Sequence, residues 1–323
     1  MPEPCKLLIG DLFQRNAQIV PNRVAAWMGG EQFTYRELND AGDSLAEQLY
    51  GLGIRRGDRI VSWADTSLEV LPLFVALAKL GAVFAPLNAT IGDEEAKPIV
   101  RMARPKMLVA DSSHIGAATA VIKQLDIPLL GHIGKGACEP SIVHLDLERP
   151  PTGEETFCDP NLEETDPHVI FFTSGSTGLP KGVILSHRAN YLRTFQGVFI
   201  VEPERSVCMF PLFHMAAFTL ALAAWQTQGE IAFASPTADS ILAAVQDRRA
   251  NRLYCIPAVW NRILASATEA WDLSSLRLLD TGTSATPVEL LQALKDRFPQ
   301  TSLRIYYGSS EVGAGTVLLD NDV

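Results

Sequence analysis

The sequence has few cysteines, and none in the arrangement of a disulfide scaffold or a zinc site. Its 323 residues include five cysteines, an odd number, widely spaced and without a Cys-x-x-Cys pair. Disulfide frameworks and structural zinc sites need cysteines in matched sets. We therefore expect reduced, mostly buried thiols and a cytoplasmic location.

Long hydrophobic runs are also missing. The longest, Met215 to Trp225, falls well short of the roughly 18 residues that a membrane-spanning helix needs. The N-terminus carries an acid at Glu3 and no sustained apolar region, unlike a secretory signal. These absences predict a protein with no transmembrane segment.

Positive charge is scarce. The chain has 27 Lys and Arg against 37 Asp and Glu, a net charge of −10. Such a protein repels polyanions, which argues against nucleic acids and anionic membranes as partners. A polyphosphate ligand would need local donors and a metal ion. With 47% hydrophobic residues, the chain can form a large core, and its length suits two or more lobes.

Stretches of strand and helix character alternate along the chain. A capping box at Thr34 and Glu37 precedes apolar residues at steps of three and four as far as Leu52, which predicts an amphipathic helix. Further helices are expected over residues 68–80, 94–102, 240–249 and 288–298. Strands are expected over residues 59–63, 82–86, 106–110, 169–173, 182–185, 207–210, 230–234, 252–256, 276–279 and 303–306. This alternation predicts an α/β fold of mainly parallel sheets flanked by helices.

The segment from Glu148 to Pro167 is rich in proline and acidic residues. Both resist compact regular structure. The segment is therefore a candidate boundary between an N-terminal α/β lobe, residues 1–165, and a second α/β lobe, residues 166–323. One long surface loop inside a single domain explains the composition equally well.

The most informative stretch runs from Thr173 to Gly182, directly after the apolar residues 169–172. Its ten residues include four hydroxyl side chains, three glycines and Lys181. Glycines allow backbone N–H groups to turn towards an anion, hydroxyls donate further hydrogen bonds, and lysine adds a positive charge. An ordinary turn also collects serine, threonine and glycine, but it needs no lysine beside a proline. The segment predicts a polyphosphate-binding loop at the end of a strand.

Two common nucleotide-binding loops do not fit this stretch. A Walker A loop ends in Gly-Lys-Ser/Thr, whereas Lys181 lies between Pro180 and Gly182. A dinucleotide-binding fingerprint requires Gly-x-Gly-x-x-Gly after an early strand, and the sequence has none there. A P-loop kinase or NTPase is therefore disfavoured.

The stretch from Thr173 to Gly182 instead resembles the phosphate-binding loop of the adenylate-forming superfamily, which includes acyl-CoA synthetases. Other motifs follow in the family's order. Residues 33–38, Phe-Thr-Tyr-Arg-Glu-Leu, are similar to an early family motif, and residues 80–87 to a Gly-Ala-x-x-x-Pro motif. Residues 211–214, Pro-Leu-Phe-His, are typical of the acyl-CoA synthetase branch. Residues 306–311, Tyr-Tyr-Gly-Ser-Ser-Glu, resemble the Tyr-Gly-x-Thr-Glu motif, with Ser310 in place of threonine.

The resemblance implies a role for each matching position. The phosphate loop would hold the β- and γ-phosphates of ATP through Thr173, Ser174, Gly175, Ser176, Thr177, Gly178 and Lys181. Gly282, Thr283 and Ser284 occupy the place of a segment that lines the adenine and acyl sites. Tyr307 would lie against the adenine, and Ser310, following Gly308 and Ser309, would bind the α-phosphate. Glu311 would help to bind Mg²⁺, and His214 would lie near the substrate carboxylate. Lys181, His214 and Glu311 are thus the candidate catalytic residues.

The resemblance further implies ATP-dependent activation of a fatty or aryl acid as acyl-AMP and its transfer to CoA. Family members continue beyond residue 323 with a barrel part, a ribose-binding aspartate and a small C-terminal domain that carries a lysine. The chain therefore resembles an N-terminal portion that lacks these parts, and we expect weak activity from it alone. A non-catalytic nucleotide- or acyl-binding regulatory protein is the alternative. Apolar surface exposed by the missing parts would favour a homo-oligomer.

Overall fold

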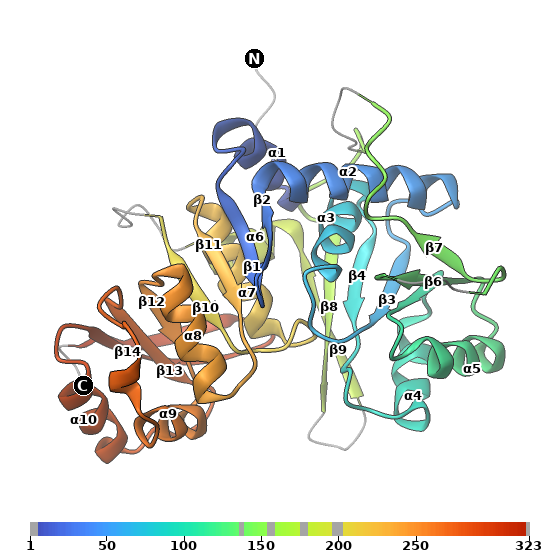
Figure 1. Ribbon diagram of the computed structural model, residues 1–323. Coiled ribbons are helices and arrows are strands. Elements are labelled where there is room, and N and C mark those ends of the chain that lie inside the picture. Colours follow the sequence, from blue (N-terminus) through green and yellow to red (C-terminus); the bar gives the residue numbers. More distant parts are fainter. Residues whose placement is uncertain (1–5, 136–138, 154–158, 175–179, 196–202, 321–323) are drawn as a thin grey trace. The chain divides into compact units, whose positions relative to one another are not determined.

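The computed structural model describes residues 6–135, 139–153, 159–174, 180–195 and 203–320 (Figure 1). The chain divides into two compact units. The first comprises Met1–Arg23, Phe33–Leu192 and Pro211–Met215, and the second comprises Val24–Gln32, Arg193–Phe210 and Ala216–Val323. Each unit is built around its own sheet.

The sheet of the first unit has its strands in the order β7-β6-β5-β3-β4-β8-β9. Every neighbouring pair is parallel except the last, because β8 and β9 form an antiparallel hairpin. The strands are β3 (Arg59–Trp63), β4 (Val83–Pro86), β5 (Met107–Ala110), β6 (Leu129–Ile133), β7 (Val143–Leu145), β8 (Pro167–Ser174) and β9 (Pro180–Ser186).

Helices cover this sheet, and the sequence accounts for the ends of several of them. Thr34 and Glu37 form the expected capping box at the start of α2. Gly81, in the left-handed conformation, ends α3, whose residues are all buried. Helix α4 continues through Pro98, although a proline inside a helix removes one backbone hydrogen bond. The helices are α1 (Ile9–Ile19), α2 (Tyr35–Gly51), α3 (Val70–Leu80), α4 (Asp93–Ala103), α5 (Ile115–Leu125) and α6 (His187–Thr194).

The sheet of the second unit has the order β15-β14-β13-β12-β10-β11-β1-β2. Strands β14 to β1 pair in parallel, and β15 adds to β14 in an antiparallel hairpin. The strands are β1 (Val24–Met28), β2 (Glu31–Thr34), β10 (Arg205–Cys208), β11 (Glu230–Phe233), β12 (Arg252–Tyr254), β13 (Leu278–Gly282), β14 (Ser302–Ser309) and β15 (Gly313–Leu318). Mainly parallel sheets flanked by helices confirm the expected fold class.

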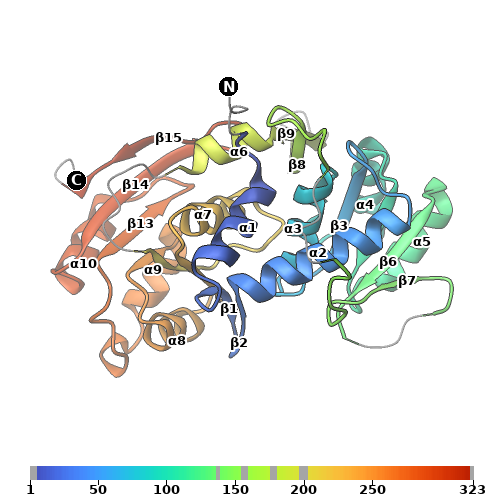
Figure 2. The same cartoon turned by 90° about the horizontal axis from the view of Figure 1, so that it is seen from above.

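Figure 2 shows helices α8, α9 and α10 along one face of the second sheet and α7 along the other. They are α7 (Met215–Gln226), α8 (Ala238–Arg248), α9 (Pro257–Leu264) and α10 (Val288–Arg297), with a 3₁₀ turn at Thr268–Ala270. Helix α7 is the longest apolar run of the sequence. Across the described parts of the chain, no helix combines the length and apolarity that a membrane span requires.

The two units do not divide at residues 165 and 166, where a lobe boundary was expected. Strand β8 pairs with β4 through Phe84 and Val169, and β9 pairs with β8. The segment from residue 166 to Leu192 therefore belongs to the first unit. The proline-rich segment before it also lies within that unit, where Asp159 N donates to the carbonyl oxygen of Lys79.

Candidate functional site

The hairpin of β8 and β9 carries the predicted phosphate loop at its turn. Thr173 lies opposite Lys181, and Ser174 lies opposite Pro180. The Lys181 side chain is exposed, and Thr173 is half-buried. Gly175, Ser176, Thr177 and Gly178 lie outside the described residues. Because β8 runs parallel to β4, the loop follows the carboxyl edge of the sheet, the edge at which open α/β sheets bind ligands.

The segment containing His214 also belongs to the first unit. Leu212 N donates to Thr66 Oγ1 at 3.0 Å, just after the carboxyl end of β3. His214 N donates to the carbonyl oxygen of Pro211. The residue is exposed, but partial burial of the imidazole lowers the pKa of His214. The structure thus places His214 at the same sheet edge as the phosphate loop.

In the second unit, two segments that contain predicted site residues lie at the carboxyl ends of neighbouring strands. Strands β13 and β14 are parallel, and Gly282 lies opposite Tyr306. The Gly282–Ser284 and Tyr307–Ser310 segments therefore lie side by side at the carboxyl edge. A Cβ at Gly282 would be 2.2 Å from the Tyr306 carbonyl oxygen, so only glycine fits there. Thr283 has a φ of +66°, a rare conformation for a β-branched residue that is concentrated at functional sites.

The β14–β15 hairpin has a second obligatory glycine. A Cβ at Gly308 would be 1.8 Å from the carbonyl oxygen of Gly313, and the register shifts between Tyr307 and Gly308. This close approach holds the turn that contains Ser310 and Glu311. Tyr307 is 77% exposed, and its ring is available to stack on a planar ligand.

Arg193, which the sequence analysis did not single out, lies beside this turn. Its Nη2 donates to Thr219 Oγ1 at 2.9 Å, and its Nη1 is 3.5 Å from the Ser310 carbonyl oxygen. Burial lowers the pKa of the guanidinium to about 10, which leaves it charged at neutral pH. The Glu311 carboxylate is exposed. One exposed carboxylate fits a magnesium ion that takes its remaining ligands from water and substrate phosphates.

A buried ionic network, which we call the Arg252 network, connects the strands behind these segments. Arg252 donates through Nη1 to Glu204 Oε1 at 2.7 Å and through Nε to Asp280 Oδ2. Arg304 donates through Nε to the other oxygen of Asp280 at 2.8 Å. Burial and the Asp280 charge raise the pKa of Tyr306, whose hydroxyl lies 3.4 Å from Arg252 Nη2. The network fixes β12, β13 and β14 relative to one another.

The sequence contained a signal for this network. Arg252, Asp280 and Arg304 are charged residues within or beside predicted apolar strands, and buried charges require partners. Their opposite signs could have indicated contact between neighbouring strands. What the sequence could not supply was the register that aligns Arg252 with Leu278 and Asp280 with Arg304.

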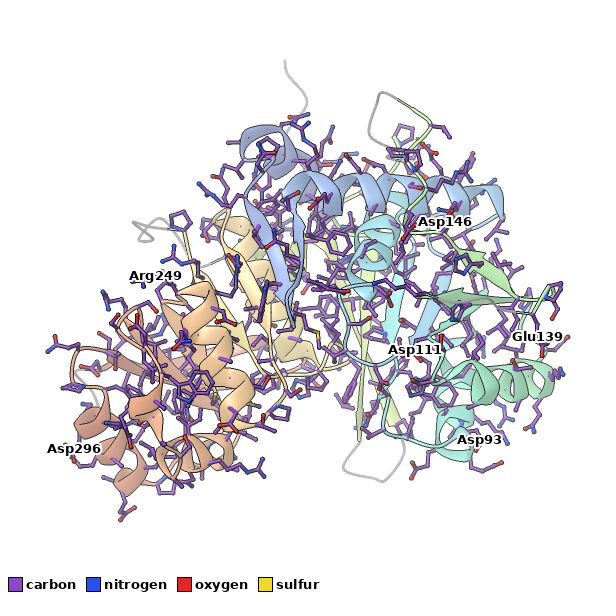
Figure 3. All side chains as sticks on the ribbon, in the orientation of Figure 1. Asp93, Asp111, Glu139, Asp146, Arg249 and Asp296 are labelled. Carbon is purple, nitrogen blue, oxygen red and sulfur yellow. The ribbon has the colours of Figure 1, made fainter. Side chains whose placement is uncertain are left out.

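One group in the described residues has the composition of a metal site, namely Asp65, Asp111 and His114. His114 Nδ1 lies 2.6 Å from Asp111 Oδ1, and its Nε2 lies 2.9 Å from the Ala89 carbonyl oxygen. Burial alone would lower the pKa of His114, but these two hydrogen bonds outweigh it and raise the pKa. Both ring nitrogens of His114 therefore make hydrogen bonds. These bonds connect the loop after β5, which contains Asp111 (Figure 3), to the loop after β4, which contains Ala89.

A family model for AMP-binding enzymes matches residues 13–323. The chain belongs to this family. A feruloyl-CoA synthase of Amycolatopsis sp is 29% identical over 317 residues, 95% of this chain and 60% of that protein. An indoleacetate–CoA ligase of Aromatoleum aromaticum is 26% identical over 94% of this chain and 60% of that protein. The chain thus spans about 60% of the length of these curated relatives.

Solved structures show the same fold. The N-terminal domain of FACL13 from Mycobacterium tuberculosis superposes with a TM-score of 0.85 at 24% identity, covering 98% of this chain and 80% of that one. The structure of a putative long-chain-fatty-acid CoA ligase from Rhodopseudomonas palustris has a TM-score of 0.86, also at 24% identity. It covers 98% of this chain and 79% of that one. The chain therefore shares its fold with the N-terminal domain of FACL13.

Proposed function

We propose that this chain is the N-terminal part of an ATP-dependent ligase that joins a fatty or aryl carboxylic acid to CoA. The observation that carries the proposal is the arrangement of the Gly282–Ser284 and Tyr307–Ser310 segments on neighbouring strands, each with a glycine that no other residue can replace. Close backbone approach of this kind suits a planar ligand lying between two strand ends. The relatives named for ferulate and indoleacetate support an aryl acid as substrate.

Different residues of the chain would bind different parts of the substrates. The loop from Thr173 to Lys181 would hold the β- and γ-phosphates, with the exposed Lys181 ammonium as its positive charge. Tyr307 would stack on the adenine, and Ser310 would donate to the α-phosphate. Exposed His214 would lie near the acid's carboxylate.

The proposed reaction has two steps. A carboxylate oxygen forms a bond to the α-phosphorus of ATP while the bond to pyrophosphate breaks, which yields acyl-AMP. The CoA thiolate then forms a bond to the acyl carbon, and AMP leaves. Mg²⁺, held by Glu311, would neutralise phosphate charge in the first step. No protein nucleophile is needed, because the chain only positions reactants and stabilises developing charge.

We also propose that the chain adenylates poorly by itself, since it spans about 60% of its relatives' length. A non-catalytic nucleotide- or acyl-binding protein remains the second candidate. The two buried thiols of the described residues, Cys208 and Cys255, are unpaired. This supports the expected cytoplasmic location.

The test is to incubate the protein with ATP, Mg²⁺, CoA and a panel of aryl and fatty acids, and to measure AMP and ADP. We expect acid-dependent AMP, reduced at least tenfold by Lys181→Met and by Gly308→Ala. ADP in place of AMP would indicate a kinase and contradict the proposal. ATP binding without acid-dependent AMP or pyrophosphate exchange, in this chain and in a longer form, would favour the non-catalytic candidate.

A further inference from the structure

The outer side of the β8–β9 hairpin forms a hollow of about 680 Å³ with helix α4. Three arginines, which we call the rim, and several apolar residues, which we call the floor, line it. Among its lining residues are Arg59, Arg101, Met102, Arg104, Phe172 and Ile184. All of them belong to the first unit, and none is a predicted site residue.

The arginines at this rim differ in what they bind. Arg59 donates through Nε and Nη2 to the carbonyl oxygens of Ala103 and Arg104, at 2.6 and 2.9 Å. It therefore satisfies the C-terminal end of α4. Arg101 and Arg104 are exposed, and neither has a side-chain hydrogen bond or ion pair with the residues that the structure describes. Two guanidinium groups are thus available to an anion, on a protein whose net charge is −10.

The floor exposes apolar area next to these charges. Ile184 is 61% exposed and Met102 is 43% exposed. Ile170 and Phe172 extend this floor into the core cluster beneath α4. Because Gly182 has no side chain, the floor stays open, and a Cβ there would lie 2.9 Å from Ile170 Cγ2.

We propose that this hollow binds a single-chain amphipathic anion, whose carboxylate or phosphate pairs with Arg101 and Arg104 and whose apolar chain covers Ile184 and Met102. The volume lies within the range of about 300–1,000 Å³ typical of small-ligand pockets. Planar guanidinium forks match both headgroups. No lining residue of the hollow belongs to the proposed nucleotide loop, residues 173–181. Strands β8 and β9, which flank that loop, nevertheless contribute residues to the floor.

The test uses this 323-residue chain with ¹³C-labelled Ile and Met methyl groups, titrated with dodecanoate and, separately, dodecyl phosphate. We expect saturable shifts of the Ile184 and Met102 methyl signals, assigned through Ile184→Val and Met102→Leu. These local signals report the hollow even if the probe also binds an acyl site. Whichever headgroup binds more tightly identifies the natural class.

Charge variants decide the role of the rim. The double variant Arg101→Gln/Arg104→Gln should weaken binding about tenfold, as expected for the loss of two solvent-exposed charge contacts. Arg101→Lys/Arg104→Lys should stay within about threefold of the original. The matched control is Lys123→Gln, which removes an exposed cation from the last turn of α5 and should change nothing.

Several results would overturn the proposal. These are the absence of shifts at Ile184 and Met102, equal shifts with uncharged octyl glucoside, or equal affinity in the Gln double variant. A response only to phosphatidylglycerol vesicles would assign the hollow to a membrane surface instead. Displacement of dodecanoate by ATP would place the probe at the phosphate loop. If the chain does not bind ATP, the proposed function is contradicted, whereas the proposed anion binding in the hollow can still be confirmed by the methyl shifts.

Discussion

The two units handle buried positive charge in different ways. In the first, Lys79 Nζ lies 2.6 Å from Asp43 Oδ1 and 2.7 Å from Asn39 Oδ1, and the contact joins helices α2 and α3. In the second, Arg252 binds two carboxylates and joins strands instead of helices. The ammonium is a compact charge that one carboxylate and one amide can satisfy, whereas a guanidinium fork can connect several acceptors.

The comparison matters for function because only one of these charges, Arg252, contacts a strand that carries a predicted site segment. Strands β13 and β14, held by Asp280 and Arg304, end in the Gly282–Ser284 and Tyr307–Ser310 segments. The Lys79 contact lies in a helical layer and supports none of the predicted site residues. Disturbing the Arg252 network should therefore affect both stability and ligand binding. Disturbing the Lys79 contact should affect stability alone.

The largest effect is expected from Asp280→Ala. It leaves Arg252 and Arg304 without their shared carboxylate, and removing one partner of a buried ion pair costs about 3–5 kcal/mol. Urea denaturation should show this loss of unfolding free energy, together with weaker ATP binding in native conditions. The control is Asp296→Ala, an exposed acid of the same unit labelled in Figure 3. An Asp280→Ala protein as stable as the control would mean that the network contributes nothing.

A pH effect of similar size should come from the first unit. His187 is fully buried, and its Nδ1 accepts from Ile9 N at the start of α1. Burial lowers the pKa of His187 from 6.5 to about 4. Between pH 6.5 and 4 the unfolded chain binds a proton that the native state excludes, so stability falls as the pH falls. The loss should reach about 3 kcal/mol at pH 4.

The measurement is urea denaturation of the original and His187→Gln proteins at pH 7, 5.5 and 4. The variant should be less stable at pH 7, because the contact with Ile9 changes, but its stability should depend less on pH across this range. Identical pH profiles for the two proteins would contradict the assignment.

A smaller loss is expected from Asp43→Asn. The variant keeps the shape of the side chain and one acceptor for Lys79, but it removes the negative charge that lies 2.6 Å from the buried ammonium. We expect a loss of about 2–3 kcal/mol in unfolding free energy, below that of Asp280→Ala. Affinity for ATP, measured by calorimetry, should remain unchanged. A clear loss of ATP affinity in this variant would remove the functional distinction between the two buried charges.

The smallest effects concern helix caps. Thr34→Ala removes two hydrogen bonds of the Thr34 hydroxyl at the start of α2, one accepted from Glu37 N and one donated to Glu37 Oε2, whereas Thr237→Ala removes the single cap of α8. We expect losses of about 1 kcal/mol or slightly more for the first and less for the second. Thermal denaturation of the two variants against the original chain measures the order. The reverse order would show that the additional bond from the Thr34 hydroxyl to the Glu37 carboxylate adds no stability.

Much of the local structure could be predicted from sequence. The helix after Thr34, the strands at 59–63 and 107–110, and the helix that begins near residue 288 lie where the periodicity placed them. Helices α1, α5 and α9 were not predicted. Short amphipathic helices such as these obtain their stability from tertiary packing more than from their own sequence.

The candidate site was predictable only as separate motifs. The adjacency of β13 and β14 brings Gly282 and Tyr307 to one sheet edge, and no periodicity specifies which strands become neighbours. The contact from Ile9 to His187 and the pairing of Arg252 with Asp280 join residues 178 and 28 positions apart. The roles assigned to Lys181, His214 and Glu311 stay predictions.

The sequence by itself determined what depends on near neighbours: helix caps, apolar stripes, the glycine- and hydroxyl-rich loop before Lys181, and the family that these motifs indicate. The tertiary structure decided strand order, the membership of β8 and β9 in the first sheet, and the partners of each buried charge. The physical reason is the distance along the sequence between the residues that interact. A cap or a stripe is stabilised within a few residues, whereas a buried arginine is satisfied only by whichever carboxylates the folded chain brings to it.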